Sequence, residues 1–364
     1  MLNRDLKEKI GQMIMVGFTG AKLTEDSPVS RALKEFSLGG VILYNIDLKC
    51  FLEAQGKNPG LTRIDGAKIC PKNIRSPGQL KALTSNLKSH SKIPPWIAVD
   101  QEGGLVSRLG PAAGYPERES PQSLGERDDL SWTGRVAEEI ARDLRDCGIN
   151  LNLAPVVDLA LNPEGFIARN GRSFGRDPDL VIRHARSFIR AHRKKEVLTC
   201  LKHFPGKGSA GPDTHYEGAD VTDFYQEREL LPFSRLIGEG LADLVMTSHI
   251  HHRGWDEDLP VTLSKRVLQG LLREKMGYGG VIISDDLQMG AIVKRYSLEE
   301  ACVLAVEAGV DILLASNNSR EGNDPELFFR IYRALIQGVE EGRISPARIE
   351  TAHTRIRAFK SIRR

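Results

Sequence analysis

Eight short apolar segments alternate with longer amphipathic ones along this chain, and few folds accommodate that pattern. The short segments are almost continuously apolar, which is typical of strands buried on both faces of a parallel sheet. Eight successive strand–helix units predict an α/β fold of the (β/α)8 type, a closed TIM-type barrel. The predicted strands are 13–18, 40–44, 96–100, 150–158, 198–204, 244–250, 280–285 and 311–316.

The longer segments have helical character. Residues 130–147 end directly before Gly148, and glycine favours the position that follows a helix. Further helices are predicted at 178–195, 264–276, 325–341 and 346–363. A length of 364 residues suits one barrel domain over 1–364. The exception is 45–76, which is rich in Gly, Pro, Lys and Asn and is expected to be a long loop insertion after the second strand.

The charge and the N-terminal sequence argue against nucleic-acid and membrane partners. The net charge is +3 and the basic residues are scattered, which gives no reason to expect nucleic acid. The apolar run 13–18 is too short for a signal segment or a membrane span. We therefore expect a cytoplasmic monomer, with an exported protein lacking its signal peptide as the alternative.

The five cysteines are few, odd in number and widely spaced, with no CxxC pair. This spacing indicates neither a disulfide framework nor a zinc ribbon, so reduced thiols are expected. Cys50 and Cys70 fall in the same irregular stretch and could pair if the protein is exported.

Polar residues gather where the predicted strands end. Active sites of such barrels lie at the carboxyl ends of the strands. Charged groups at the ends of apolar strands are unfavourable unless they pair, so six polar endings together predict a pocket for a polar ligand such as a sugar or phosphate ester. The endings are Asp100–Gly104, Asp158, Lys202–Gly206, 247–249, 284–286 and 316–318.

Several of these endings form a recognisable set. KHFPGKGSAGPDTH at 202–215 resembles the signature of family 3 β-N-acetylglucosaminidases, and GVIISDDLQM at 280–289 resembles their nucleophile strand. DQEGG at 100–104, LAPVVD at 153–158 and RSFGRDP at 172–178 also resemble family motifs and occur in the family's order. The resemblance extends from about residue 6 to about residue 320.

The resemblance implies a retaining exo-β-N-acetylglucosaminidase of the single-domain type. It assigns Asp285 as nucleophile and His215 as acid/base, with Asp213 as the partner of that histidine. Its substrates would be peptidoglycan or chitin fragments, and it implies neither a metal nor an organic cofactor. The residues implied to line the sugar subsite are Asp100, Arg108, Arg172, Lys202 and His203.

The chemistry of these residues agrees with that assignment. Glycoside hydrolysis needs one group that attacks the anomeric carbon and one that protonates the leaving oxygen. An imidazole, with an ordinary pKa of about 6.5, can donate and accept a proton near neutral pH. Asp213 lies two residues before His215 and can fix its tautomer. We expect Lys202 and Arg172 to favour the ionised form of Asp285.

Two positions depart from the family pattern. Leu105 stands where arginine usually follows DQEGG, and Lys207 stands where the second signature histidine is expected. They leave the exact substrate open and are the support for one alternative, a sugar-binding barrel without catalysis. A phosphorylase is a second alternative, because a histidine acid/base carries less negative charge than a glutamate and would repel phosphate less. A metal-dependent hydrolase is the weakest alternative, because His249, His251 and His252 do not follow H-E-x-x-H spacing.

Overall fold

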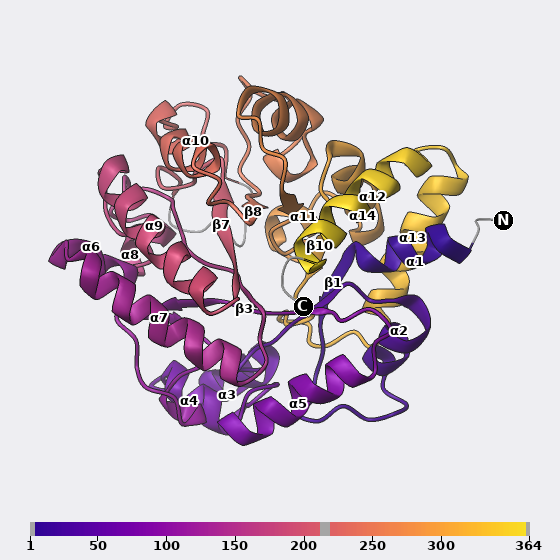
Figure 1. The fold of residues 1–364 in the computed structure, drawn as a ribbon, viewed down its shortest axis with the longest axis horizontal. Coiled ribbons are helices and arrows are strands. Elements are labelled where there is room, and N and C mark those ends of the chain that lie inside the picture. Colours follow the sequence, from indigo (N-terminus) through magenta and orange to yellow (C-terminus); the bar gives the residue numbers. More distant parts are fainter. Residues whose placement is uncertain (1–3, 212–218, 362–364) are drawn as a thin grey trace.

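The computed structural model describes residues 4–211 and 219–361, and its centre is a ring of eight parallel strands surrounded by helices (Figure 1). The order is β10-β1-β2-β3-β6-β7-β8-β9, and a parallel bridge between Ile283 and Ile312 joins its two ends. The predicted barrel is therefore confirmed. The strands are β1 (Ile14–Gly17), β2 (Gly40–Ile42), β3 (Trp96–Val99), β6 (Leu151–Asn152), β7 (Leu198–Phe204), β8 (Leu244–Thr247), β9 (Val281–Ile283) and β10 (Leu313–Ala315).

Each strand lies within one predicted segment, and most are shorter than predicted. The largest difference is in 150–158, where only Leu151–Asn152 forms a continuous strand. Pro155 has no N–H to donate to the ladder. Val156 then returns to the sheet through a bridge to Lys202.

The helices cover the outside of the ring (Figure 1). α9 shows why such segments fold: Asp177 caps its first turn, Pro178 occupies the first helical position, and its apolar face is buried. No helix among the described residues is long and apolar enough to cross a membrane. The helices are α1 (Arg4–Gln12), α2 (Pro28–Phe36), α3 (Leu48–Lys57), α4 (Arg63–Ile69), α5 (Pro77–Ser89), α6 (Pro121–Arg127), α7 (Leu130–Asp146), α8 (Phe166–Arg169), α9 (Pro178–Lys194), α10 (Leu231–Gly238), a π-type helix (Arg266–Lys275), α11 (Gly290–Val293), α12 (Leu298–Ala308), α13 (Leu327–Glu340) and α14 (Pro346–Ser361).

A small antiparallel arm extends from the end of β3. Its strands β4 (Gln101–Gly103) and β5 (Val106–Ser107) contain most of the DQEGG segment and were not predicted. Gly103 adopts a φ of +100°, and a Cβ there would lie 2.1 Å from the carbonyl oxygen of Glu119. The close packing of this turn therefore requires glycine. Arg108 directly follows the arm and forms an ion pair with Asp100 at the end of β3.

The prediction of an irregular loop over 45–76 is wrong. The segment contains α3 and α4, each with its own capping residue: Asp47 for α3, and Thr62, in a capping box with Asp65, for α4. These helices are short, so the sequence contains too few turns to show a helical period.

The expectation of reduced thiols is also wrong for one pair. Cys50 and Cys70 form a disulfide with an S–S distance of 2.03 Å, which links α3 to the end of α4. Cys147, Cys200 and Cys302 are free and buried, as expected.

Candidate active site

A cavity of about 1280 Å³ opens at the carboxyl ends of the strands. Polar side chains at the carboxyl ends of β3, β7 and β9 line it, and the arm, α8 and the α3–α4 segment form further parts of its wall. Six of the eight residues predicted for the sugar site line this cavity: Asp100, Arg108, Arg172, Lys202, His203 and Asp285. The other two, Asp213 and His215, lie outside the described residues.

One side of the cavity is a network of buried charges. The Nζ of Lys202 lies 2.8 Å from Asp100 Oδ1 and 2.7 Å from Glu102 Oε1. Arg172 donates to both carboxylate oxygens of Glu102, at 2.8 and 2.7 Å, and Arg108 lies 3.3 Å from Asp100. The side chains of Lys202 and Glu102 are only 2% and 1% exposed. Fixed charged groups of this kind can bind sugar hydroxyls with defined geometry.

Glu102 was not among the predicted site residues. Its position inside DQEGG could have indicated a site residue, because a buried carboxylate next to a barrel strand needs a charged partner. Its two partners, Lys202 and Arg172, come from segments far along the chain, so the pairing could not be read from the sequence.

The network keeps its carboxylates ionised. Burial raises the pKa of Asp100, but the charges of Lys202 and Arg108 outweigh that effect and leave the pKa at about 2. The pKa of Glu102 is lowered in the same way, since Arg172 and Lys202 outweigh its burial. Each buried charge is thus compensated by its neighbours.

Replacing Asp100 by asparagine should reduce the sensitivity of the fold to acid. The folded-state pKa of Asp100, about 2, lies below its ordinary value of 3.8. Its ionised form therefore stabilises the fold above about pH 4, and this stabilisation is lost as the pH falls through 2. Between pH 4 and pH 2 the wild type should lose about 2 kcal/mol more unfolding free energy than Asp100→Asn. Urea unfolding at stepped pH measures this difference, and identical pH dependence in the two proteins would contradict it.

His203 and Lys202 are adjacent in the chain, yet both line the cavity. The register of β7 against β8 shifts between Leu201 and Phe204. His203 Nδ1 lies 2.7 Å from Asp158 Oδ2, so the LAPVVD segment fixes the imidazole. The strand end is therefore bent, which is the condition under which both side chains could face the interior.

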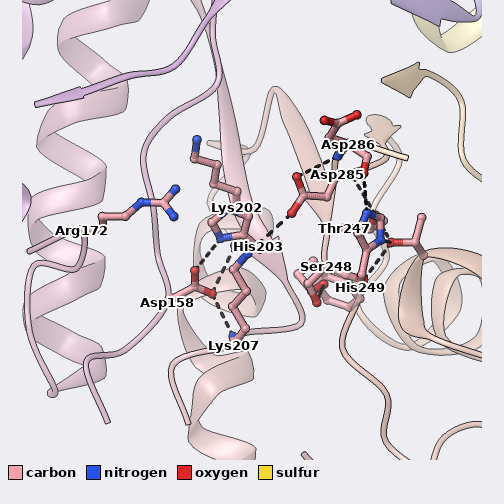
Figure 2. A network of polar contacts seen from close by, with 12 residues as sticks. Asp158, Arg172, Lys202, His203, Lys207, Thr247, Ser248, His249, Asp285 and Asp286 are labelled. Carbon is pink, nitrogen blue, oxygen red and sulfur yellow. Dashed lines mark hydrogen bonds and ion pairs between the residues drawn. The ribbon is translucent and has the colours of Figure 1, made fainter. Parts of the chain in front are cut away.

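Asp285 follows β9 on the opposite side of the cavity (Figure 2). Its backbone N–H donates to Thr247 Oγ1 at 3.3 Å, and its Oδ1 accepts from the N–H of Asp286 at 2.8 Å. Its other oxygen, Oδ2, lies 3.6 Å from the Nζ of Lys207. These contacts fix the carboxylate with an ammonium beside it.

The expectation that Lys202 and Arg172 favour the ionised form of Asp285 stays a prediction. Lys202 forms ion pairs with Asp100 and Glu102, and Arg172 forms one with Glu102. Lys207 forms an ion pair with Asp285 (Figure 2). In the sequence, the one notable property of Lys207 was that it replaces the second histidine of the family signature. The structure makes it part of the candidate site.

The segment that carries Lys207 is held from both sides. Asp158 Oδ1 accepts from the Lys207 N–H at 3.0 Å, and Glu229 Oε2 accepts from the N–H of Gly208 at 2.7 Å. A Cβ on Gly208 would lie 1.7 Å from the carbonyl oxygen of Leu159, so only glycine fits there. Burial lowers the pKa of Lys207, although Asp285 and Asp158 oppose this.

Asp286 and His249 support this side of the cavity. Asp286 Oδ1 accepts from the N–H groups of Gln288 and Ser316, at 3.1 and 3.0 Å. His249 Nε2 lies 2.9 Å from the Asp286 carbonyl oxygen. His249 is therefore a buried residue with hydrogen-bond partners, and backbone groups hold the Asp286 carboxylate. Within 4–211 and 219–361, no three His, Cys, Asp or Glu side chains are placed to hold a metal ion.

The family to which this barrel belongs follows from its similarity to known proteins. Residues 5–359 match the glycosyl hydrolase family 3 N-terminal domain. The chain belongs to glycosyl hydrolase family 3. The resemblance found in its motifs is therefore confirmed over almost the whole length.

Relatives of this family 3 chain include named hexosaminidases. Beta-hexosaminidase A of Pseudoalteromonas piscicida is 30% identical over 319 residues, which are 82% of this chain and 53% of that protein. A beta-hexosaminidase of Alkalilimnicola ehrlichii is 33% identical over 269 residues, 70% of this chain and 74% of that protein. The family 3 beta-N-acetylglucosaminidase structure from Paenibacillus sp. str. FPU-7 superposes with a TM-score of 0.85 at 33% identity, over 100% of this chain and 63% of that one. The chain thus spans about half to three quarters of the length of these relatives.

Proposed function

We propose that this family 3 glycoside hydrolase releases terminal, non-reducing β-linked N-acetylhexosamine with retention of anomeric configuration. The observation that carries the proposal is the position of Asp285, whose carboxylate is fixed beside Lys207 and faces the buried pair of Asp100 and Lys202 across one cavity. The relatives named hexosaminidase and N-acetylglucosaminidase support the choice of sugar. Peptidoglycan- or chitin-derived fragments are the proposed natural substrates.

The proposed reaction has two displacements. Asp285 Oδ2 attacks the anomeric carbon while the glycosidic bond breaks, and His215 donates a proton to the leaving oxygen. Water then attacks the glycosyl-aspartate, His215 accepts a proton from it, and the Asp285 carboxylate departs. Asp213 would orient the imidazole in both steps. Asp100, Arg108, Arg172, Lys202 and His203 would hold the hydroxyl groups of the sugar.

Hydrolysis of a nitrophenyl N-acetyl-β-glucosaminide, followed by proton NMR, tests the proposal. The β-anomer of the free sugar should appear first, because two inversions at one carbon restore the starting configuration. An α-anomer as first product would contradict the mechanism. Turnover that requires phosphate and yields the sugar phosphate would indicate a phosphorylase. Absence of turnover would favour a binding role.

Replacing Lys207 by methionine should move the acidic limb of kcat/KM toward higher pH. The reason is that an ammonium 3.6 Å from Oδ2 favours the ionised carboxylate that attack requires. Lys207→Arg keeps the positive charge and should leave the limb near its wild-type position. A uniform loss of activity at every pH, with the limb unmoved, would show that Lys207 does not act through the charge of Asp285.

The disulfide supports the alternative that the protein is exported. Cys50 and Cys70 are bonded, and such bonds persist mainly in oxidising compartments. We therefore propose that the protein works outside the reducing cytoplasm. Thiol alkylation of protein taken from its native cells without prior reduction should leave both residues unlabelled. Labelling of both would place the protein in the cytoplasm.

A further inference from the structure

The cavity extends well beyond the buried charges that face Asp285. Its volume of about 1280 Å³ exceeds the roughly 300–1,000 Å³ typical of pockets for a drug-sized ligand. Asp100 and Lys202 lie at its buried end, whereas residues of α3 and of the segment leading into α4 line its more exposed end. One sugar held at the buried end would therefore leave space beside α3 and α4.

The α3–α4 segment, residues 45–72, is built as a unit of its own. Its centre is the ring of Phe51, and Gly66 approaches that ring so closely that an added Cβ would lie 2.5 Å from Cδ2. Phe51 clusters with Ala67 and Cys70 separately from the core of the barrel. The disulfide from Cys50 to Cys70 closes the unit.

Polar contacts fasten this unit to the mouth of the barrel, where α3 and α4 lie together (Figure 1). Asn318, after β10, accepts from the N–H of Leu48 at 3.0 Å and donates to the carbonyl oxygen of Ile46 at 3.1 Å. The Nζ of Lys72 lies 3.2 Å from Asn318 Oδ1. On the other side Ala112, beyond the β4–β5 arm, packs against the Phe51 cluster. The unit is therefore a fixed wall of the cavity.

The wall combines apolar surface with hydrogen-bond donors. Leu52 and Leu61 line the cavity together with Gln55 and Arg63. Arg63 is exposed, and its side chain lines the cavity. A ligand oxygen placed there would therefore gain a charged donor that already faces the cavity. Apolar side chains beside such donors suit a pyranose ring, which presents C–H groups on its faces and hydroxyl groups at its edge.

We propose that the α3–α4 unit is a second sugar subsite, which binds the leaving-group pyranose through the apolar surface of Leu52 and Leu61 and through hydrogen bonds from Arg63 and Gln55. The inference rests on the proposed function, because that function places the first sugar beside Asp285. It makes the preferred substrate an oligosaccharide. The Cys50–Cys70 disulfide would then stabilise the surface that binds the second sugar.

Two substrates distinguish this subsite from the catalytic site. Nitrophenyl N-acetyl-β-glucosaminide has no second sugar, whereas N,N′-diacetylchitobiose has one. Arg63→Ala should lower the ratio of kcat/KM for chitobiose to kcat/KM for the nitrophenyl glycoside by about tenfold, mainly through KM. Lys68→Ala is the matched control, because Lys68 is an exposed cation of α4 that does not line the cavity. It should leave the ratio unchanged. An equal effect of Arg63→Ala on both substrates, or no effect, would overturn the subsite.

Calorimetry on the Asp285→Asn background separates this inference from the proposed function. Removing Arg63 should weaken chitobiose binding by about tenfold and leave N-acetylglucosamine binding unchanged. Reducing the disulfide, or replacing both Cys50 and Cys70 by serine, should act in the same direction. If Arg63→Ala selectively weakens chitobiose binding on this background while the protein with Asp285 intact hydrolyses neither substrate, the function is refuted and the subsite is kept. If chitobiose binding is unchanged while the protein with Asp285 intact hydrolyses both substrates, the subsite alone is refuted.

Discussion

Replacing Asp285 by alanine should lower kcat for the nitrophenyl glycoside by on the order of 10⁴-fold or more. The carboxylate provides the bond to the anomeric carbon in the proposed reaction, and neither neighbouring residue can substitute. Asp286 is directed elsewhere by the N–H groups of Gln288 and Ser316, and Lys207 is a cation. Steady-state kinetics with matched circular dichroism spectra measures the effect on a folded protein.

Azide provides the control for this substitution. A small anion can enter the space left by the carboxylate and attack the same face of the sugar, so activity of Asp285→Ala should rise with azide and yield the α-glycosyl azide. Asp286→Ala should retain more activity and give no azide adduct. Comparable activity in Asp285→Ala and wild type would remove Asp285 from the reaction.

Replacing Arg172 by methionine should lower the free energy of unfolding by about 3–5 kcal/mol. Arg172 and Glu102 form a two-point ion pair whose side chains are 8% and 1% exposed. Methionine replaces the aliphatic part of the arginine side chain but carries no charge, so among the described residues Glu102 would keep Lys202 as its cationic partner. Urea unfolding at pH 7 measures the change.

Arg186 offers a matched control for burial. Its guanidinium binds Glu239 with the same two-point geometry, at 2.7 and 2.6 Å, but the side chains are 29% and 35% exposed. Arg186→Met should therefore cost less than about 1 kcal/mol. Equal losses for the two substitutions would show that the network around Glu102 does not contribute through buried charge.

The barrel could be predicted because its signal is local. Each strand is an apolar segment buried on both faces, and each helix places its apolar residues on one face, so neighbouring residues suffice to identify them. The α3–α4 unit lacked such a signal. Its two short helices are stabilised by a separate apolar cluster around Phe51 and by a disulfide. Both form only when residues apart in the sequence come together in the folded chain.

The candidate site was predictable where motifs and strand ends coincide. Asp100 follows β3, Lys202 lies in β7 and Asp285 follows β9. The barrel brings these three positions together at one end. The pairing of charges was not predictable. Lys207 forms an ion pair with Asp285. Its segment after β7 is held in place because the N–H groups of Lys207 and Gly208 donate hydrogen bonds to Asp158 and Glu229.

The central claim is that a glycosyl group becomes bonded to Asp285, and trapping of that intermediate tests it most directly. A 5-fluoro N-acetylglucosaminyl substrate with a good leaving group should form the intermediate faster than water removes it, because fluorine slows both steps and the leaving group restores only the first. Protease digestion and fragment mass spectrometry should then find one sugar on the peptide containing Asp285, with the added mass on Asp285 and not on Asp286. A label on any other residue, or an active enzyme that turns over the compound without forming an adduct, would contradict the account.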